Sequence, residues 1–214
     1  MRSIRHWTPD YIVARLAVLR FQRRMGKPLP ILATGAIQFL ASYLTEEDHV
    51  FEYGCGYSTP WLARRAGLVV SVEDNADWYA RIEAELRAYP NAKLSLFDAK
   101  QDPSPPPPER WGYEEYVVSE AYVYAVDSYP LEFFDLVIID GQARRYTALA
   151  ALPHLKPSGI LLWDDFGPPS YDPANPQEVY RDFAAQTRGW RHVFFTDGTG
   201  SRTALFFKPA SAAG

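Results

Sequence analysis

Short apolar runs alternate with helix-favouring segments through most of this chain. Runs rich in β-branched and aromatic residues, each of strand length, lie at 50–53, 69–73, 94–97, 134–140 and 160–163. Segments with helical spacing of apolar positions separate them, at 58–66, 76–88 and 146–155. This alternation predicts βαβ units, and therefore a doubly wound α/β fold of the Rossmann type with a mostly parallel sheet.

Two helices are predicted before the first strand, at 9–25 and 34–44, with the breaker-rich stretch 26–30 between them. We expect residues 1–45 to form a helical cap or an interface. Apolar positions between residues 11 and 24 are interleaved with arginines such as Arg15 and Arg20, which predicts an amphipathic basic helix. We favour packing of this helix against the domain or a second subunit over a place on a membrane surface.

The main domain is expected to cover residues 46–209, interrupted by an insert at 102–130. The insert opens with four consecutive prolines at 105–108, which cannot donate backbone hydrogen bonds and predict an extended loop. Its Tyr-rich part, 111–129, is either a lid over a substrate or a helix lying on the sheet edge. After it, a helix near 177–187 precedes two β-like runs, 192–195 and 204–207, which we expect to pair as an edge hairpin, and 210–214 is expected to be a disordered tail.

Composition narrows the class of protein. The chain has 214 residues, 47% hydrophobic and 22% charged, which suits one domain with a sizeable core. A net charge of −4 without a basic block disfavours nucleic acid as a partner. The only cysteine, Cys55, excludes an intrachain disulfide and a zinc site built from several thiolates. No stretch reaches the roughly 18 to 20 apolar residues needed to span a bilayer, and we expect a cytoplasmic protein.

The first chemical signal is a glycine turn directly after the strand at 50–53. Gly54 and Gly56 flank Cys55, and Ser58 and Thr59 begin the helix that follows. Such a turn lets the backbone approach a ligand closely, and the helix start offers unpaired N–H groups. The next strand ends in Glu73, where an acid can accept hydrogen bonds from both ribose hydroxyls of an adenosine ligand. The turn lacks the third glycine of the dinucleotide fingerprint, so a nicotinamide dinucleotide fits less well.

In order, the segments EYGCG, SVED, FDLVIIDG and LKPSGILLWDD resemble the motif series of class I S-adenosylmethionine-dependent methyltransferases, over roughly residues 34–208. The resemblance implies seven strands with the last antiparallel, and S-adenosylmethionine as the cofactor. It places residues along the methionine part of the cofactor (Glu52, Gly54, Gly56), at the ribose (Glu73, with Asp74 beside it) and near the adenine (Asp98, Ala99). Ser58 and Thr59 either bond the cofactor or cap the helix.

The second signal is acidic. Asp140 ends one apolar strand and Asp164 and Asp165 end the next, so their carboxylates should converge at the carboxyl edge of the sheet. Hard divalent cations prefer oxygen ligands arranged in this way. The pattern also resembles magnesium-dependent O-methyltransferases that act on sugar hydroxyls, in which a metal binds the acceptor oxygen. One departure is that Arg144 and Arg145 stand near the place where some of those enzymes carry a histidine.

The resemblance makes Asp140, Asp164 and Arg144 the candidate catalytic residues, and Asp140, Asp164 and Asp165 the candidate Mg²⁺ ligands. The expected reaction is methyl transfer to a hydroxyl of a small molecule, with a sugar or glycoside first. The alternatives are that Asp140 binds only the cofactor amine and transfer to oxygen or nitrogen proceeds without metal, or that the chain is an inactive cofactor-binding or dimer-forming module. The N-terminal helices and the sheet edge are compatible with a homodimer.

Overall fold

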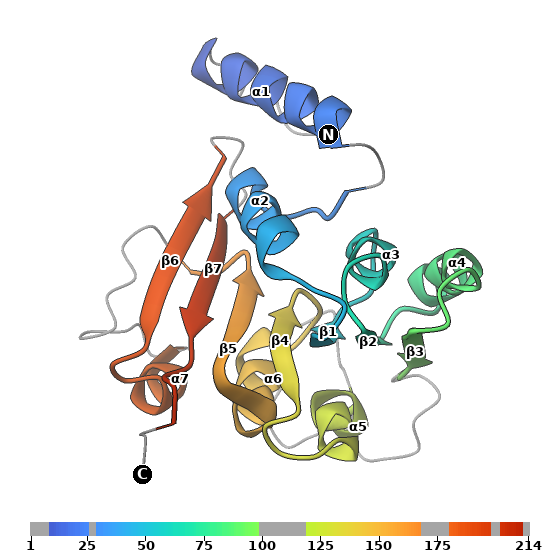
Figure 1. Cartoon of the computed structure of the whole chain (residues 1–214), viewed down its shortest axis with the longest axis vertical. Coiled ribbons are helices and arrows are strands. Elements are labelled where there is room, and N and C mark those ends of the chain that lie inside the picture. The colour runs from blue at the N-terminus through green and yellow to red at the C-terminus, as the bar shows by residue number, and fades with distance from the viewer. Residues whose placement is uncertain (1–8, 26–28, 99–118, 168–179, 198–201, 212–214) are drawn as a thin grey trace.

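The computed structural model describes residues 9–25, 29–98, 119–167, 180–197 and 202–211. A seven-stranded sheet with the order β3-β2-β1-β4-β5-β7-β6 forms its centre (Figure 1). The strands are β1 (His49–Tyr53), β2 (Leu68–Glu73), β3 (Ala92–Leu96), β4 (Phe134–Ile139), β5 (Leu155–Asp164), β6 (Arg191–Thr196) and β7 (Arg202–Phe207). The first five are parallel, and β7 runs antiparallel to both β5 and β6. The predicted doubly wound fold and edge hairpin are confirmed.

Helices cover both faces of the sheet, because its strands alternate apolar side chains between two cores. Leu136 and Ile138 of β4 point to the face covered by α2 (Thr34–Tyr43) and α3 (Ser58–Ala63). Val137 and Ile139 point to the opposite face, which is covered by α5 (Glu120–Val123), α6 (Arg144–Ala151) and α7 (Arg181–Gln186). Helix α4 (Ala76–Leu86) packs beside β3, and α1 (Pro9–Met25) lies outermost (Figure 1).

The predicted helix at 146–155 was too long, and the predicted strand at 160–163 too short. Helix α6 ends at Ala151, a 3-10 turn covers Leu152–His154, and β5 already starts at Leu155. The backbone explains the difference, since Phe133 N–H donates to the His154 carbonyl at 2.8 Å and Glu132 N–H to the Pro153 carbonyl at 3.0 Å. The stretch that looked like a helix stop is therefore the bulged beginning of a strand.

The described end of the insert packs against the sheet. Tyr122 and Val123 of α5 are buried, and Val126 follows in the 3-10 turn Ala125–Ser128. The Tyr53 hydroxyl donates to the Val123 carbonyl at 2.7 Å, which ties this segment to β1. From residue 119 on, the insert is thus a helix packed into the core on one face of the sheet, and not a surface helix on the sheet edge. Residues 99–118, and with them most of the predicted lid, lie outside the described part. The tail residues 212–214 do as well.

Candidate functional site at the carboxyl edge of the sheet

The sheet order reverses between β1 and β4, and the loops after these two strands touch. Gly54 has a φ of +88°, and a Cβ at this position would lie 2.6 Å from the backbone of Gly141 in the loop after β4. Only glycine combines this conformation with this approach. Gly56 differs, because its φ is not positive and an added Cβ would meet only Ser58 Oγ, at 3.7 Å. The protein itself therefore requires glycine at 54, but leaves open space beside 56.

Glu52, in β1, is connected to the glycine turn through Thr59. Its side chain is fully buried, and its Oε2 accepts hydrogen bonds from Thr59 Oγ1 at 2.6 Å and from Ser71 Oγ. Thr59 Oγ1 in turn accepts from the Gly56 N–H at 3.1 Å. Burial raises the pKa of Glu52 to about 6, against the hydrogen bonds from Ser58, Ser71 and Thr59 that lower it. Its other oxygen, Oε1, is buried and has no partner among the described residues.

These contacts show why the turn carries its polar residues. Ser58 and Thr59 are buried and directed at Glu52, so the proposed helix-capping role is not what their contacts show: α3 has no side-chain N-cap at Tyr57. Ser71 was missed by the sequence reasoning. A serine in the buried run 69–73 was the available signal, because a polar side chain inside a strand needs a partner.

Glu73 connects the loop after β1 with the loop after β2. Its carboxylate is buried and accepts from the Cys55 N–H at 2.7 Å through Oε2 and from the Asn75 N–H at 2.9 Å through Oε1. Burial is the main cause of its raised pKa, and Asp74 adds to it. A carboxylate offers about four lone-pair positions, so about two remain for a ligand. Asp98 is half-buried after β3, and it raises the pKa of Asp74 in addition to burial. Ala99 lies outside the described residues.

Asp140, directly after β4, and Asp164, the last residue of β5, lie side by side, with Asp165 next in the chain. Ile139 pairs with Trp163, so Asp140 and Asp164 leave adjacent strands side by side. Asp164 is buried, and its Oδ1 accepts from Thr203 Oγ1 of β7 at 2.7 Å. Asp165 is 64% exposed. Thr203, which anchors Asp164, was missed because it comes from a strand 39 residues away.

Arg144 lies among these aspartates and uses all its donor directions there. Its Nε donates to the Gly141 carbonyl at 2.9 Å, and its terminal nitrogens donate to the carbonyls of Asp140, at 3.1 Å, and of Asp164. The same nitrogens lie 3.4 Å from Asp140 Oδ1 and 3.6 Å from Asp165 Oδ2. Within the described ranges, no group of three His, Cys, Asp or Glu residues is arranged to hold a metal ion. The Arg144 guanidinium lies beside Asp140 and Asp165, two of the three predicted Mg²⁺ ligands.

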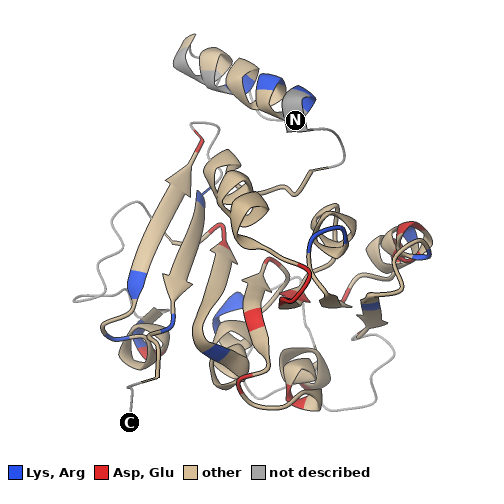
Figure 2. Cartoon of the chain, in the orientation of Figure 1, with Lys and Arg blue, Asp and Glu red and all other residues tan. Residues whose placement is uncertain are grey.

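The edge is strongly acidic. Five carboxyl groups with raised pKa values gather there, namely Glu52, Glu73, Asp74, Asp140 and Asp164. Burial is the largest cause for each. Repulsion from Asp164 further raises the pKa of Asp140, repulsion from Asp165 further raises that of Asp164 to about 6, and Arg144 opposes both. Figure 2 shows the acidic residues at the ends of neighbouring strands. Perturbed carboxyls that cluster in this way are typical of functional sites, and this cluster suits a positively charged ligand.

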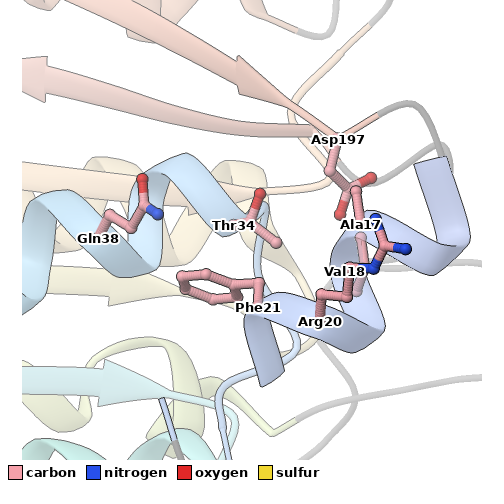
Figure 3. A pocket seen from close by; sticks show the side chains of 7 residues that line it. All are labelled: Ala17, Val18, Arg20, Phe21, Thr34, Gln38 and Asp197. Carbon is pink, nitrogen blue, oxygen red and sulfur yellow. The ribbon is translucent and has the colours of Figure 1, made fainter. Parts of the chain in front are cut away.

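A cavity of about 400 Å³ lies between α1 and α2, beside Asp197 after β6 (Figure 3). Phe21 and Val18 give it an apolar side, and Thr34 and Gln38 a polar one. None of the predicted site residues lines it. The start of α2 itself is tied to the edge, since the Ala33 N–H donates to Thr203 Oγ1 at 3.0 Å, and Thr203 bonds Asp164.

No protein family model and no curated protein matches the chain. Solved structures do match it. A methyltransferase-like protein from Silicibacter pomeroyi aligns with a TM-score of 0.58 at 23% identity over 87% of this chain and 92% of its own. The chain has a class I methyltransferase fold. Two further structures share this fold. A proposed methyltransferase from Streptococcus mutans in complex with SAH aligns with a TM-score of 0.55 at 15% identity, over 86% of this chain and 99% of its own. An rRNA methylase from Streptococcus thermophilus aligns with a TM-score of 0.54 at 16% identity, over 86% of this chain and 99% of its own. At these identities the likeness establishes the fold alone.

Proposed function

We propose that this protein is an S-adenosylmethionine-dependent methyltransferase. The observation that carries the proposal is Glu73, a buried carboxylate at the end of β2 that backbone N–H groups from two loops hold in place beside the glycine turn. Its remaining lone pairs suit the two hydroxyls of a ribose. The open space at Gly56 lies on the same turn, and the buried Oε1 of Glu52, near the end of β1, has no partner among the described residues. The S. mutans structure, with the same fold, is in complex with SAH.

The cofactor, when bound, supplies a methyl group on a sulfonium that an acceptor displaces in line. The chain then has to orient the acceptor and accept its proton. Asp140 and Asp164 are the proposed bases, because each is a carboxyl of raised pKa at the centre of the edge. Arg144 acts as a positioning residue: it donates to the backbone carbonyls of both aspartates and keeps the two strand ends in register.

The acceptor we propose is a hydroxyl on a small molecule, a sugar or glycoside first. The support is the likeness of the LKPSGILLWDD segment to sugar O-methyltransferases, together with Asp140 and Asp164 at the edge, which can accept a hydroxyl proton. The aspartate set does not fit Mg²⁺, because Arg144 takes up Asp140 and Asp165. We therefore propose methyl transfer without a metal, the alternative to the magnesium-dependent reaction expected from the sequence.

The test is calorimetric titration of S-adenosylmethionine and S-adenosylhomocysteine into the full chain, with and without Mg²⁺. Wild type should bind in the micromolar range, and Glu73→Gln should bind at least tenfold more weakly, because the amide nitrogen cannot accept from the ribose. Glu85→Gln, an exposed position on α4, is the matched control and should bind like wild type. Absence of binding by wild type in every condition, with the protein folded by circular dichroism, would overturn the proposal.

A further inference from the structure

Helix α1 presents two apolar faces. Val18 and Phe21 lie toward the body of the protein, where Val18 is buried and Phe21 packs against the core that contains α2. Ile12, Leu16 and Leu19 follow one another at spacings of four and three residues, so they share a single face on the other side of the helix. These three side chains are 41%, 49% and 37% exposed. Figure 1 shows α1 outermost on the molecule.

Arginines accompany this outer face. Arg15 and Arg23 are exposed on α1, and Arg23 continues the line of Ile12, Leu16 and Leu19 by one further turn. Arg20 is exposed as well but lines the cavity on the inner side of the helix. With Arg24 and the single acid Asp10, the helix sequence carries a charge of +3. Because the whole chain has a net charge of −4, the residues outside α1 together carry −7. The basic charge is thus concentrated beside an exposed apolar stripe.

We propose that the outer face of α1 docks on an anionic lipid surface. The occupant must supply both apolar volume and negative charge. Pairing of the same face from two copies would supply the first but bring the arginines of both helices together. Outside α1, the exposed large apolar side chains of the described residues lie one to a segment, at Ile31, Trp78, Tyr124, Leu131 and Val193. The acidic remainder of a second copy therefore offers no matching stripe.

A bilayer containing acidic phospholipids meets both needs. Aliphatic side chains enter the boundary between headgroups and acyl chains, while flanking arginines contact phosphates. This is docking in the plane of the surface, since no described helix has the length and hydropathy of a membrane span. The sequence reasoning favoured packing on the domain, and the inner face does pack there; the outer face is what remains to be covered. The inference does not rest on the proposed methyl transfer.

The experiment is co-sedimentation of the full chain with vesicles of phosphatidylcholine alone or with 30% phosphatidylserine, without cofactor. We expect at least tenfold stronger partitioning onto the anionic vesicles, a tenfold loss in Leu16→Ser/Leu19→Ser, and a comparable loss in Arg15→Gln/Arg23→Gln. The matched control is Ile31→Ser/Val193→Ser, which removes two exposed aliphatic side chains elsewhere, 69% and 44% exposed, and should bind within twofold of wild type.

Two results would overturn the proposal. One is partitioning that is the same for both lipid mixtures or for all variants. The other is the lack of vesicle binding together with a wild-type dimer, seen by sedimentation equilibrium, that becomes monomeric in Leu16→Ser/Leu19→Ser; that result would make a second copy the occupant. Circular dichroism of each variant confirms that it is folded.

Discussion

Gly56→Ala tests whether the glycine at position 56 is needed by a bound ligand and not by the fold. The added methyl group would lie 3.7 Å from its nearest neighbour, Ser58 Oγ, and the backbone at 56 does not have a positive φ. The free energy of unfolding should therefore change by no more than about 0.5 kcal/mol, as at most unstrained sites. Alanine also restricts the unfolded chain, which acts in favour of the folded state. If the cofactor fills the open space, the methyl group overpacks the complex by about 1–3 kcal/mol. That range equals roughly a 5- to 150-fold loss of affinity.

The assay pairs thermal unfolding with titration of S-adenosylmethionine, and Gly54→Ala is the contrasting variant. At Gly54 the Cβ would lie 2.6 Å from Gly141 and φ is +88°, so this variant should lose stability with or without ligand. Unchanged affinity in Gly56→Ala would refute the placement of the cofactor beside the turn. A large loss of stability in Gly56→Ala would refute the claim that the fold leaves this space open.

Three further predictions concern the charged groups of the edge. Since the folded-state pKa of Glu52 is about 6 against an ordinary 4.5, the free energy of unfolding should fall by about 2 kcal/mol in total as pH rises from about 3 to about 7.5, most of it between 4.5 and 6. Urea titrations should show that part of the fall missing in Glu52→Gln, and equal slopes would contradict the reasoning. Arg144→Gln leaves carbonyls at the ends of β4 and β5 without donors and should lower the free energy of unfolding by about 1–3 kcal/mol. Melting temperatures measure this loss. The control is Arg145→Gln, which removes only an exposed ion pair with Asp182 and should have a smaller effect. Once an acceptor is found, turnover should survive dialysis against EDTA, and a tenfold loss restored by Mg²⁺ would disprove metal-independent transfer.

Hydropathy patterning was sufficient for the fold, because each strand needs an apolar partner on both faces and each helix on one. It failed at the start of β5, where Pro157 and Gly159 are typical of a helix stop but lie in a bulged strand paired with β4. That pairing depends on backbone contacts of Phe133 and Glu132 that no local pattern contains.

For the site, the sequence located the carboxylates but not their partners. Parallel strands bring their carboxyl ends to one edge, so the convergence of Asp140 and Asp164 follows from topology alone. The position of Arg144 does not, since it depends on the left-handed backbone of Ala143, φ +51°, at the start of α6. Nor does the bond from Thr203, which requires β7 to insert between β5 and β6.

The same burial that raises the carboxyl pKa values also predicts the sign of the ligand's charge. Desolvated carboxylates repel one another, and Asp140 and Asp164 do so directly, with Arg144 as their counter-charge. A ligand that brings a positive charge relieves this repulsion, and a neutral one does not. S-adenosylmethionine carries a sulfonium that S-adenosylhomocysteine lacks. The acidic edge should therefore favour the charged cofactor over its neutral product, which promotes release of the product after transfer.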